Sequence, residues 1–152
     1  MLSRHIDMRA MLLTMNHDRF YSELIGLLTF KERFEYLKLE GSVGKETFGY
    51  NRYLNQILYR SYKWRKFRRQ IILRDNGCDL GLPGYDICDT IFVHHINPIT
   101  EEDVELDHPD IYNPEFVICT RGITHNAIHY SNIDIIPKEE PDREINDTIP
   151  WR

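Results

Sequence analysis

Two stretches of the chain decide its fold: residues 87–96 read ICDTIFVHHI, and residues 116–130 read FVICTRGITHNAIHY. The first is rich in β-branched and aromatic residues, which favours a strand. In the second, FVICT predicts a short strand over residues 116–120, and RGITHNAIHYSN, which continues to residue 132, predicts a short helix over residues 121–132. Two strands followed by a helix indicate a mixed α+β fold.

Four of the seven histidines lie in these stretches as two pairs, His94 with His95 and His125 with His129. Residues four apart share one face of a helix, so His125 and His129 point toward a common position. Neighbouring strand residues point to opposite sides, so only one of His94 and His95 faces that position. Imidazole is both a metal ligand and a general base at neutral pH. The pattern predicts a hydrolytic site in which three histidines bind a metal ion and the fourth acts as the base.

The residues before these stretches are patterned as helices. Residues 29–39 (TFKERFEYLKL) begin with Thr29 and Glu32 at the spacing of a capping box, and a second helix is predicted over residues 51–59. Ser61 is placed to cap a third helix, which must end at a turn signal over residues 75–77. One apolar stripe of this third helix is expected to face the core: Trp64, Phe67 and Ile71.

Charge is distributed unevenly along the 152 residues. The net charge is −5, but residues 52–74 carry eight basic side chains and no acid, whereas residues 75–152 have a net charge of −13. A basic block of this density suits contact with phosphates. The alternative is a solvated helix that pairs with the acidic half of the same chain.

Three further segments carry weaker signals. GLPGY, residues 81–85, predicts a tight turn. Residues 100–115 are acidic, contain two prolines and show no period, which predicts a long loop. From residue 133 onward, prolines and charges predict an extended tail that lies over the surface.

The three cysteines, Cys78, Cys88 and Cys119, are odd in number and lack C-x-x-C spacing. This argues against a disulfide framework and against a zinc site built from sulfur, so we expect small buried side chains. No apolar run approaches the roughly 20 residues of a membrane span, and the first residues lack a signal-peptide pattern. We therefore expect an intracellular protein with no membrane partner.

HHINP at residues 94–98 and FVICTRGITHNAIHY at residues 116–130 together resemble the ββα-metal motif of HNH endonucleases. From about Tyr21 to the closing NDTIPWR, the chain resembles the small HNH proteins that phages encode. The resemblance implies an α+β fold built around a ββα-metal (HNH) core. It divides the chain into an N-terminal helical region, a nuclease core that includes the basic helix, and an extended C-terminal tail: residues 1–60, 61–132 and 133–152.

Carried over residue by residue, the resemblance implies that His94 is the metal ligand on the strand and that His95 is the general base. His125 and His129 would complete the metal site, as in histidine-rich members such as the DNase domains of nuclease colicins. Asn126 would support the motif as a neighbour on the helix, without a catalytic role.

One position departs from the family pattern. The Asn that braces the loop between the strands normally stands nine residues before the first helix histidine, and here that position is Phe116. Asn113 lies three residues earlier, and either its side chain or backbone groups would brace the loop instead. The departure bears on the geometry of the loop more than on the metal site, because that Asn is not a ligand.

The activity that the resemblance implies is hydrolysis of DNA phosphodiester bonds, by nicking or double-strand cutting, which leaves a 5′ phosphate and a 3′ hydroxyl. One divalent metal ion would be the cofactor, Mg²⁺ or Mn²⁺, while three imidazoles also suit Zn²⁺ or Ni²⁺. Contacts to the DNA are expected from six basic side chains: Lys63, Arg65, Lys66, Arg68, Arg69 and Arg121.

The resemblance further suggests a phage protein in the host cytoplasm that assists the terminase in genome packaging, with terminase or portal components as partners. Homing of a mobile element is the competing role. Two other functions stay open: a non-catalytic, metal-stapled protein for DNA binding or assembly, and a metal-dependent hydrolase of another substrate. A fourth histidine argues against the first of these, and the basic helix argues against the second.

Overall fold

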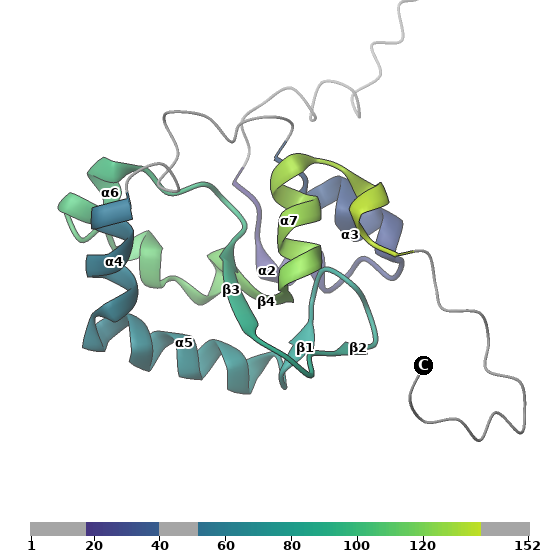
Figure 1. The fold of residues 1–152 in the computed structure, drawn as a ribbon, viewed down its shortest axis with the longest axis horizontal. Coiled ribbons are helices and arrows are strands. Elements are labelled where there is room, and N and C mark those ends of the chain that lie inside the picture. The colour runs from purple at the N-terminus through teal and green to yellow at the C-terminus, as the bar shows by residue number, and fades with distance from the viewer. Residues whose placement is uncertain (1–17, 40–51, 138–152) are drawn as a thin grey trace, which may run out of the picture.

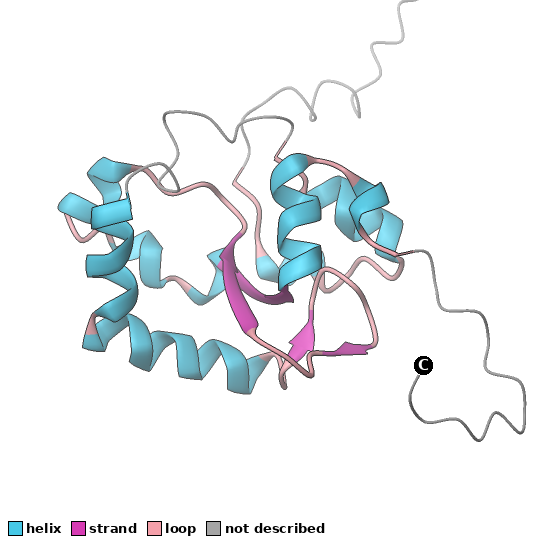
Figure 2. Ribbon diagram, in the orientation of Figure 1, coloured by secondary structure: helices cyan, strands magenta, loops and turns pink. Residues whose placement is uncertain are grey.

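The structure, a computed structural model, describes residues 18–39 and 52–137 (Figure 1). It is a mixed α+β fold in which two small antiparallel strand pairs lie among helices (Figure 2). The helices are α2 (Tyr21–Leu24), α3 (Phe30–Leu37), α4 (Arg52–Arg60), α5 (Tyr62–Arg74), α6 (Glu101–Glu105) and α7 (Gly122–Tyr130). The strands are β1 (Cys78–Asp79), β2 (Tyr85–Asp86), β3 (Ile91–His95) and β4 (Val117–Arg121).

Two predicted helix starts are confirmed by their caps. The Thr29 hydroxyl accepts a hydrogen bond from the backbone N–H of Glu32 at 3.2 Å, and the Glu32 carboxylate accepts from the N–H of Thr29 at 2.9 Å. The Ser61 hydroxyl accepts from the N–H of Trp64 at 3.0 Å, so α5 begins where its sequence predicts. The turn after α5 is also confirmed, since Asn76 and Gly77 both have positive φ angles, 54° and 66°.

The two strands and the helix predicted from the deciding stretches are present as β3, β4 and α7. β3 pairs antiparallel with β4, with His94 opposite Ile118 and His95 opposite Val117. β4 runs directly into α7, which packs against both strands. The first strand is shorter than predicted, because the N–H of Ile87 donates to the carbonyl of Gly77 at 3.1 Å and so continues the β1–β2 hairpin.

β4 is covered on both faces, which explains why every residue from 117 to 120 is buried. Val117 and Cys119 belong to an apolar cluster with side chains of α4 and α5, among them Trp64. Ile118 points to the opposite face and packs in a second cluster, whose other members come from α2, α7 and the segments around α3 and β3: Leu24, Leu37, Leu39, Ile96 and Ile128. The described N-terminal helices therefore share their core with the strand–strand–helix unit.

Two buried aspartates, Asp75 and Asp79, also hold this unit together. One carboxylate oxygen of Asp75 accepts the backbone N–H of Cys119 at 2.7 Å. Asp79 accepts the N–H of Gly81 at 2.9 Å and the N–H of Arg121 at 3.2 Å. Both carboxylates thus tie the β1 region to β4 through backbone groups that would otherwise be buried without partners.

Replacement of Asp79 by alanine tests this bracing. The variant leaves buried N–H groups without acceptors, so we expect the free energy of unfolding to fall by about 2–3 kcal/mol. Urea denaturation followed by circular dichroism measures the change. Asp89→Ala, at an exposed position, is the matched control and should leave the unfolding free energy within about 0.5 kcal/mol of wild type. Equal midpoints for the two variants would contradict the role of Asp79.

The prediction of a long loop over residues 100–115 is wrong. Thr100 and Asp103 form a reciprocal capping box, and the short helix α6 follows it. Two 3-10 turns then begin at Pro109 and Pro114. A five-residue helix is too short to display a helical period, so the only available signal was the pairing of Thr100 with Asp103.

The prediction of an extended tail from residue 133 onward is wrong for residues 133–136. Residues 133–135 form a 3-10 turn and Ile136 is buried in a cluster with Phe34 and Ala127, so the start of this segment is packed rather than extended. Residues 138–152 lie outside the described part of the chain.

The expectation for the cysteines holds only for Cys119, which is fully buried. Cys88 is exposed and Cys78 is half-buried. Among the described helices, none is both long enough and apolar enough to cross a bilayer.

Candidate metal centre

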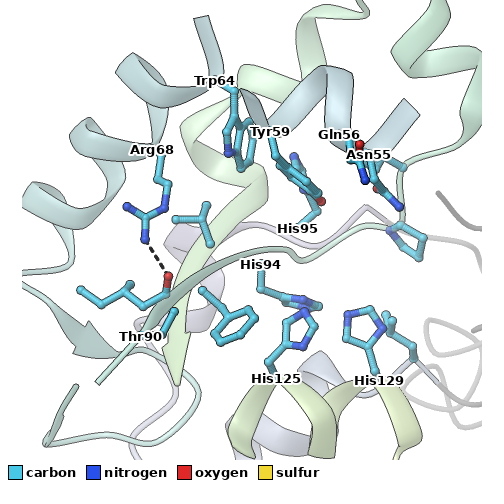
Figure 3. Close-up of a pocket in the computed structure, with 16 residues that line it drawn as sticks. Asn55, Gln56, Tyr59, Trp64, Arg68, Thr90, His94, His95, His125 and His129 are labelled. Atoms are coloured by element: carbon cyan, nitrogen blue, oxygen red, sulfur yellow. Dashed lines mark hydrogen bonds between the residues drawn. The ribbon is translucent and has the colours of Figure 1, made fainter. Parts of the chain in front are cut away.

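Three histidines from two elements converge in the structure. His94 comes from β3, and His125 and His129 come from successive turns of α7 (Figure 3). One ring nitrogen of each lies within 4.8 Å of those of the other two. An imidazole nitrogen that binds a divalent ion lies roughly 2.1 Å from it, so three nitrogens this close together could share one ion. The predicted convergence of these residues is confirmed.

His94 is the most deeply buried member of the cluster. Its Nε2 is buried and has no hydrogen-bond partner among the described residues. A buried polar atom without a partner costs free energy unless a ligand satisfies it. Burial, reinforced by the nearby His125 and His129, lowers the pKa of His94 well below its usual range. Burial also lowers the pKa of His129, to about 4. His94 and His129 are therefore neutral at pH 7, which is the form that binds a metal ion.

His95 lies on the other side of β3, as strand geometry requires. Its Nε2 is 3.0 Å from the carbonyl oxygen of Ile111, and its ring stacks on the indole of Trp64 at 5.3 Å between centroids. A carbonyl can only accept, so Nε2 carries the proton and Nδ1 keeps its lone pair. Burial lowers the pKa of His95 to about 4, so the ring is neutral at pH 7. One nitrogen is thus fixed by the protein, and the other is available as a base.

The low pKa of His95 predicts acid sensitivity of the metal-free protein. An unfolded chain binds a proton on this histidine below about pH 6.5, whereas the folded chain binds it only near pH 4. The stability that neutral His95 contributes is therefore complete above pH 6.5 and is lost as the pH falls toward 4. For this group alone, the free energy of unfolding should fall by about 2 kcal/mol between pH 7.5 and pH 5. Urea unfolding in EDTA measures it. A His95→Gln variant should show a shallower dependence on pH, and identical slopes would contradict the assignment.

The histidines line a cleft of about 690 Å³. Its walls come from β3, from α7 and from the helices α4 and α5 (Figure 3). None of the described residues that line the cleft is acidic, and Arg68 supplies its permanent positive charge. The cleft therefore suits an anionic ligand. The helices contribute five of its side chains: Asn55, Gln56, Tyr59, Trp64 and Arg68.

The basic residues expected to contact DNA occupy two different environments. Arg65, Lys66 and Arg69 are exposed on α5 and make no ion pair within residues 18–39 and 52–137. Lys63 instead donates to the Asp107 carboxylate at 2.6 Å and lies over the ring of Tyr112. The alternative prediction, that the basic helix pairs with the acidic half of the chain, is therefore correct for Lys63. It is not correct for Arg65, Lys66 and Arg69.

The two remaining arginines are held by the protein. A terminal nitrogen of Arg68 donates to the carbonyl of Ile91 at 2.7 Å, which holds the guanidinium beside the cleft. Arg121 lies over the ring of Tyr85 and 3.8 Å from the carboxylate of Asp79, and only 13% of its side chain is exposed. Arg121 is therefore engaged in bracing β4 against the β1–β2 hairpin.

Both expected supporting asparagines make local contacts. Asn126 is exposed on α7, and its side chain hydrogen-bonds to His125. Asn113 caps the turn before β4 by accepting the N–H of Glu115 at 3.0 Å. Phe116 packs its ring against Phe20, and its carbonyl accepts the N–H of Ile96 at 2.8 Å. The backbone bond between Ile96 and Phe116 thus joins the two ends of the loop, whereas the Asn113 side chain only caps the turn before β4.

Sequence reasoning missed part of the site. It placed Trp64 in the core, where it is buried, but not against His95. It did not connect Asn55, Gln56 and Tyr59 with the histidines at all, although they line the same cleft. No local pattern marks these three residues, since their position depends on how α4 packs against α5 and α6.

Comparisons with known proteins add no assignment. No family model matches the chain, no curated protein matches it, and no solved structure matches it. The proposal below therefore rests on the residues and on the geometry in which they are held.

Proposed function

We propose that this chain is a metal-dependent endonuclease of the HNH type that hydrolyses phosphodiester bonds in DNA. The proposal rests mainly on the different environments of the two neighbouring histidines of β3, His94 and His95. A buried, unpartnered His94 nitrogen faces His125 and His129, while the next residue is a neutral histidine with one fixed nitrogen. A purely structural metal site has no use for that fourth histidine.

His94, His125 and His129 would hold the ion, and the orphaned Nε2 of His94 fits that role. When bound, a divalent ion supplies positive charge that stabilises the negative charge developing on the phosphate and on the departing 3′ oxygen. Three imidazoles bind Zn²⁺ and Ni²⁺ more tightly than Mn²⁺ or Mg²⁺. Mg²⁺ or Mn²⁺ would occupy the same site only where its concentration exceeds that of the tighter ion by more than the ratio of their affinities.

His95 would act as the general base. Its Nδ1 takes a proton from the attacking water, because Nε2 is already committed to the Ile111 carbonyl. The stacked Trp64 ring and that hydrogen bond restrict rotation of the imidazole, so the lone pair is held in a fixed direction. With a pKa of about 4, His95 stays unprotonated throughout the neutral range. Its protonation therefore imposes no fall in rate until the pH approaches 5.

The exposed basic face of α5, formed by Arg65, Lys66 and Arg69, would contact the DNA backbone. Replacing all three with alanine should weaken binding to duplex DNA roughly tenfold and reduce the slope of log affinity against log salt by about two to three. Fluorescence anisotropy at several salt concentrations measures both. Lys31→Ala, at an exposed position on α3, is the control and should change neither. An unchanged salt slope in the triple variant would show that these three side chains do not contact the DNA backbone.

The products test the reaction itself. End-labelled duplex DNA is incubated with purified protein and Mg²⁺, Mn²⁺, Ni²⁺ or Zn²⁺, and the new ends are analysed. Hydrolysis with water as the nucleophile should leave a 5′ phosphate, which a ligase accepts, and a 3′ hydroxyl. A 3′ phosphate or a cyclic end would contradict the proposal. A role beside a phage terminase in the host cytoplasm stays a prediction of the resemblance, and stimulation of cleavage by added terminase would test it.

A further inference from the structure

One aromatic side chain of β3 contacts the histidine cluster without belonging to it. Phe92 lies two residues before His94, so both side chains point to the same face of the strand. The Phe92 ring stacks on the imidazole of His125, with 5.2 Å between the ring centroids and 30° between the planes. Phe92 also lines the cleft, and 41% of it is exposed. A residue that offers no ligand atom therefore contacts one of the three candidate ligands directly.

The place of the Phe92 ring depends on a glycine in α7. Gly122 is the first residue of this helix and lies three residues before His125, so both face the same side of it. A Cβ atom at position 122 would lie 3.3 Å from the Cε2 atom of Phe92, which is closer than most carbon contacts. Because Gly122 has no side chain, the phenyl ring can lie over the first turn of α7 and reach the imidazole of His125.

His125 gains from such a contact because its ring must be oriented before it can bind an ion. It is only half-buried, whereas His94 is fully enclosed beside it (Figure 3). Its side chain also hydrogen-bonds to Asn126, but Asn126 is exposed, so water competes for that bond. An imidazole that rotates loses rotamer freedom when it binds a metal ion, and this loss weakens binding. A ring stacked against His125 restricts that rotation before the ion arrives.

We propose that Phe92 is a positioning residue of the metal centre, whose ring holds His125 in the orientation that faces His94 and His129. The inference rests on the metal site of the proposed function, and it deepens it by adding a residue that acts through a ligand. Groups that orient a metal ligand typically change the metal affinity or the activity by about ten- to a hundredfold. Truncation of Phe92 should therefore weaken metal binding although all three ligands remain.

Calorimetric titration of the metal-free protein with Zn²⁺ tests this role without any cleavage. Phe92→Ala should bind Zn²⁺ roughly tenfold more weakly than wild type, and Phe92→Tyr, which keeps the ring, should restore the affinity to within about twofold. Tyr62→Ala removes an exposed aromatic side chain of α5 outside the cleft and should bind Zn²⁺ as wild type does. Equal affinities of wild type and Phe92→Ala would overturn the proposal.

A double-mutant cycle with His125 separates positioning from a general effect on the fold. In a His125→Ala background there is no imidazole for the Phe92 ring to hold, so adding Phe92→Ala should leave the already weakened Zn²⁺ affinity unchanged. A further tenfold loss in the double variant would show that Phe92 does not act through His125, and would overturn the proposal.

Cleavage with Mn²⁺ distinguishes this inference from the proposed function. Phe92→Ala should cut DNA more slowly than wild type at low Mn²⁺ and approach the wild-type rate as Mn²⁺ saturates the site. A protein that shows the expected Zn²⁺ affinities but cuts nothing keeps the positioning role of Phe92 and loses the nuclease. A protein that cuts DNA while wild type and Phe92→Ala bind Zn²⁺ equally keeps the nuclease and loses the positioning role.

Discussion

His95→Ala is expected to cut DNA about a hundredfold to ten-thousandfold more slowly than wild type, the range over which a positioned general base accelerates a reaction. His95 is held by the Ile111 carbonyl and by Trp64, and it lies across β3 from the metal ligands. Its loss removes the base without removing a ligand. The affinity for metal, measured by titration calorimetry, should therefore stay within a few-fold of wild type while the single-turnover cleavage rate falls.

Two further variants serve as controls for the slow cleavage expected of His95→Ala. His95→Gln fills more of the buried position than alanine does and should be equally slow, because an amide is not a base at neutral pH. His108→Ala, at an exposed histidine outside the cluster, should cut at the wild-type rate. Retention of more than a tenth of the wild-type rate in both His95 variants would exclude His95 as the base.

The second large effect is expected on metal-dependent stability. An ion that binds only the folded chain stabilises it by about 2.7 kcal/mol at a hundredfold excess over its dissociation constant. For a chain of this size, that raises the melting temperature by roughly 5–10 °C. His94→Ala removes the buried ligand and should abolish most of the shift with Zn²⁺ or Mn²⁺, as measured by differential scanning calorimetry with and without EDTA.

His129→Ala is the companion variant, since His129 is only half-buried and its truncation disturbs the core less. It should lose the metal-induced shift as His94→Ala does, whereas His108→Ala should keep it. A full shift in both ligand variants would show that the ion binds elsewhere. A full loss of the shift together with normal cleavage would separate metal binding from catalysis and contradict the proposed mechanism.

The parts of the site that the sequence predicts correctly depend on local geometry. His125 and His129 share a helical face because they are four residues apart, and His94 and His95 point oppositely because they are neighbours on a strand. Both relations hold within a single helix or strand, so they do not depend on how the helix and the strand pack together. The helix N-caps at Thr29 and Ser61 were predictable for the same reason, since a cap involves only the next three residues.

The parts that it misses depend on tertiary packing. Asn55 and Gln56 reach the cleft because α4 packs against α5 and α6, and no spacing within α4 predicts that packing. Asp75 and Asp79 look like turn residues, yet their carboxylates are buried against backbone N–H groups of β4 and of the residues near it. Lys63 looks equivalent to its basic neighbours, but Asp107, 44 residues away in sequence, binds it.

The most direct test of the account is cleavage of supercoiled plasmid by the purified chain, assayed with each divalent ion, with EDTA, and beside the His95→Ala variant. The account predicts nicked or linear plasmid with at least one ion, none in EDTA, and a loss of at least a hundredfold in rate for the variant. Equal cleavage in EDTA, or equal cleavage by wild type and His95→Ala, would contradict it. So would a folded, metal-binding protein that leaves the plasmid intact with every ion.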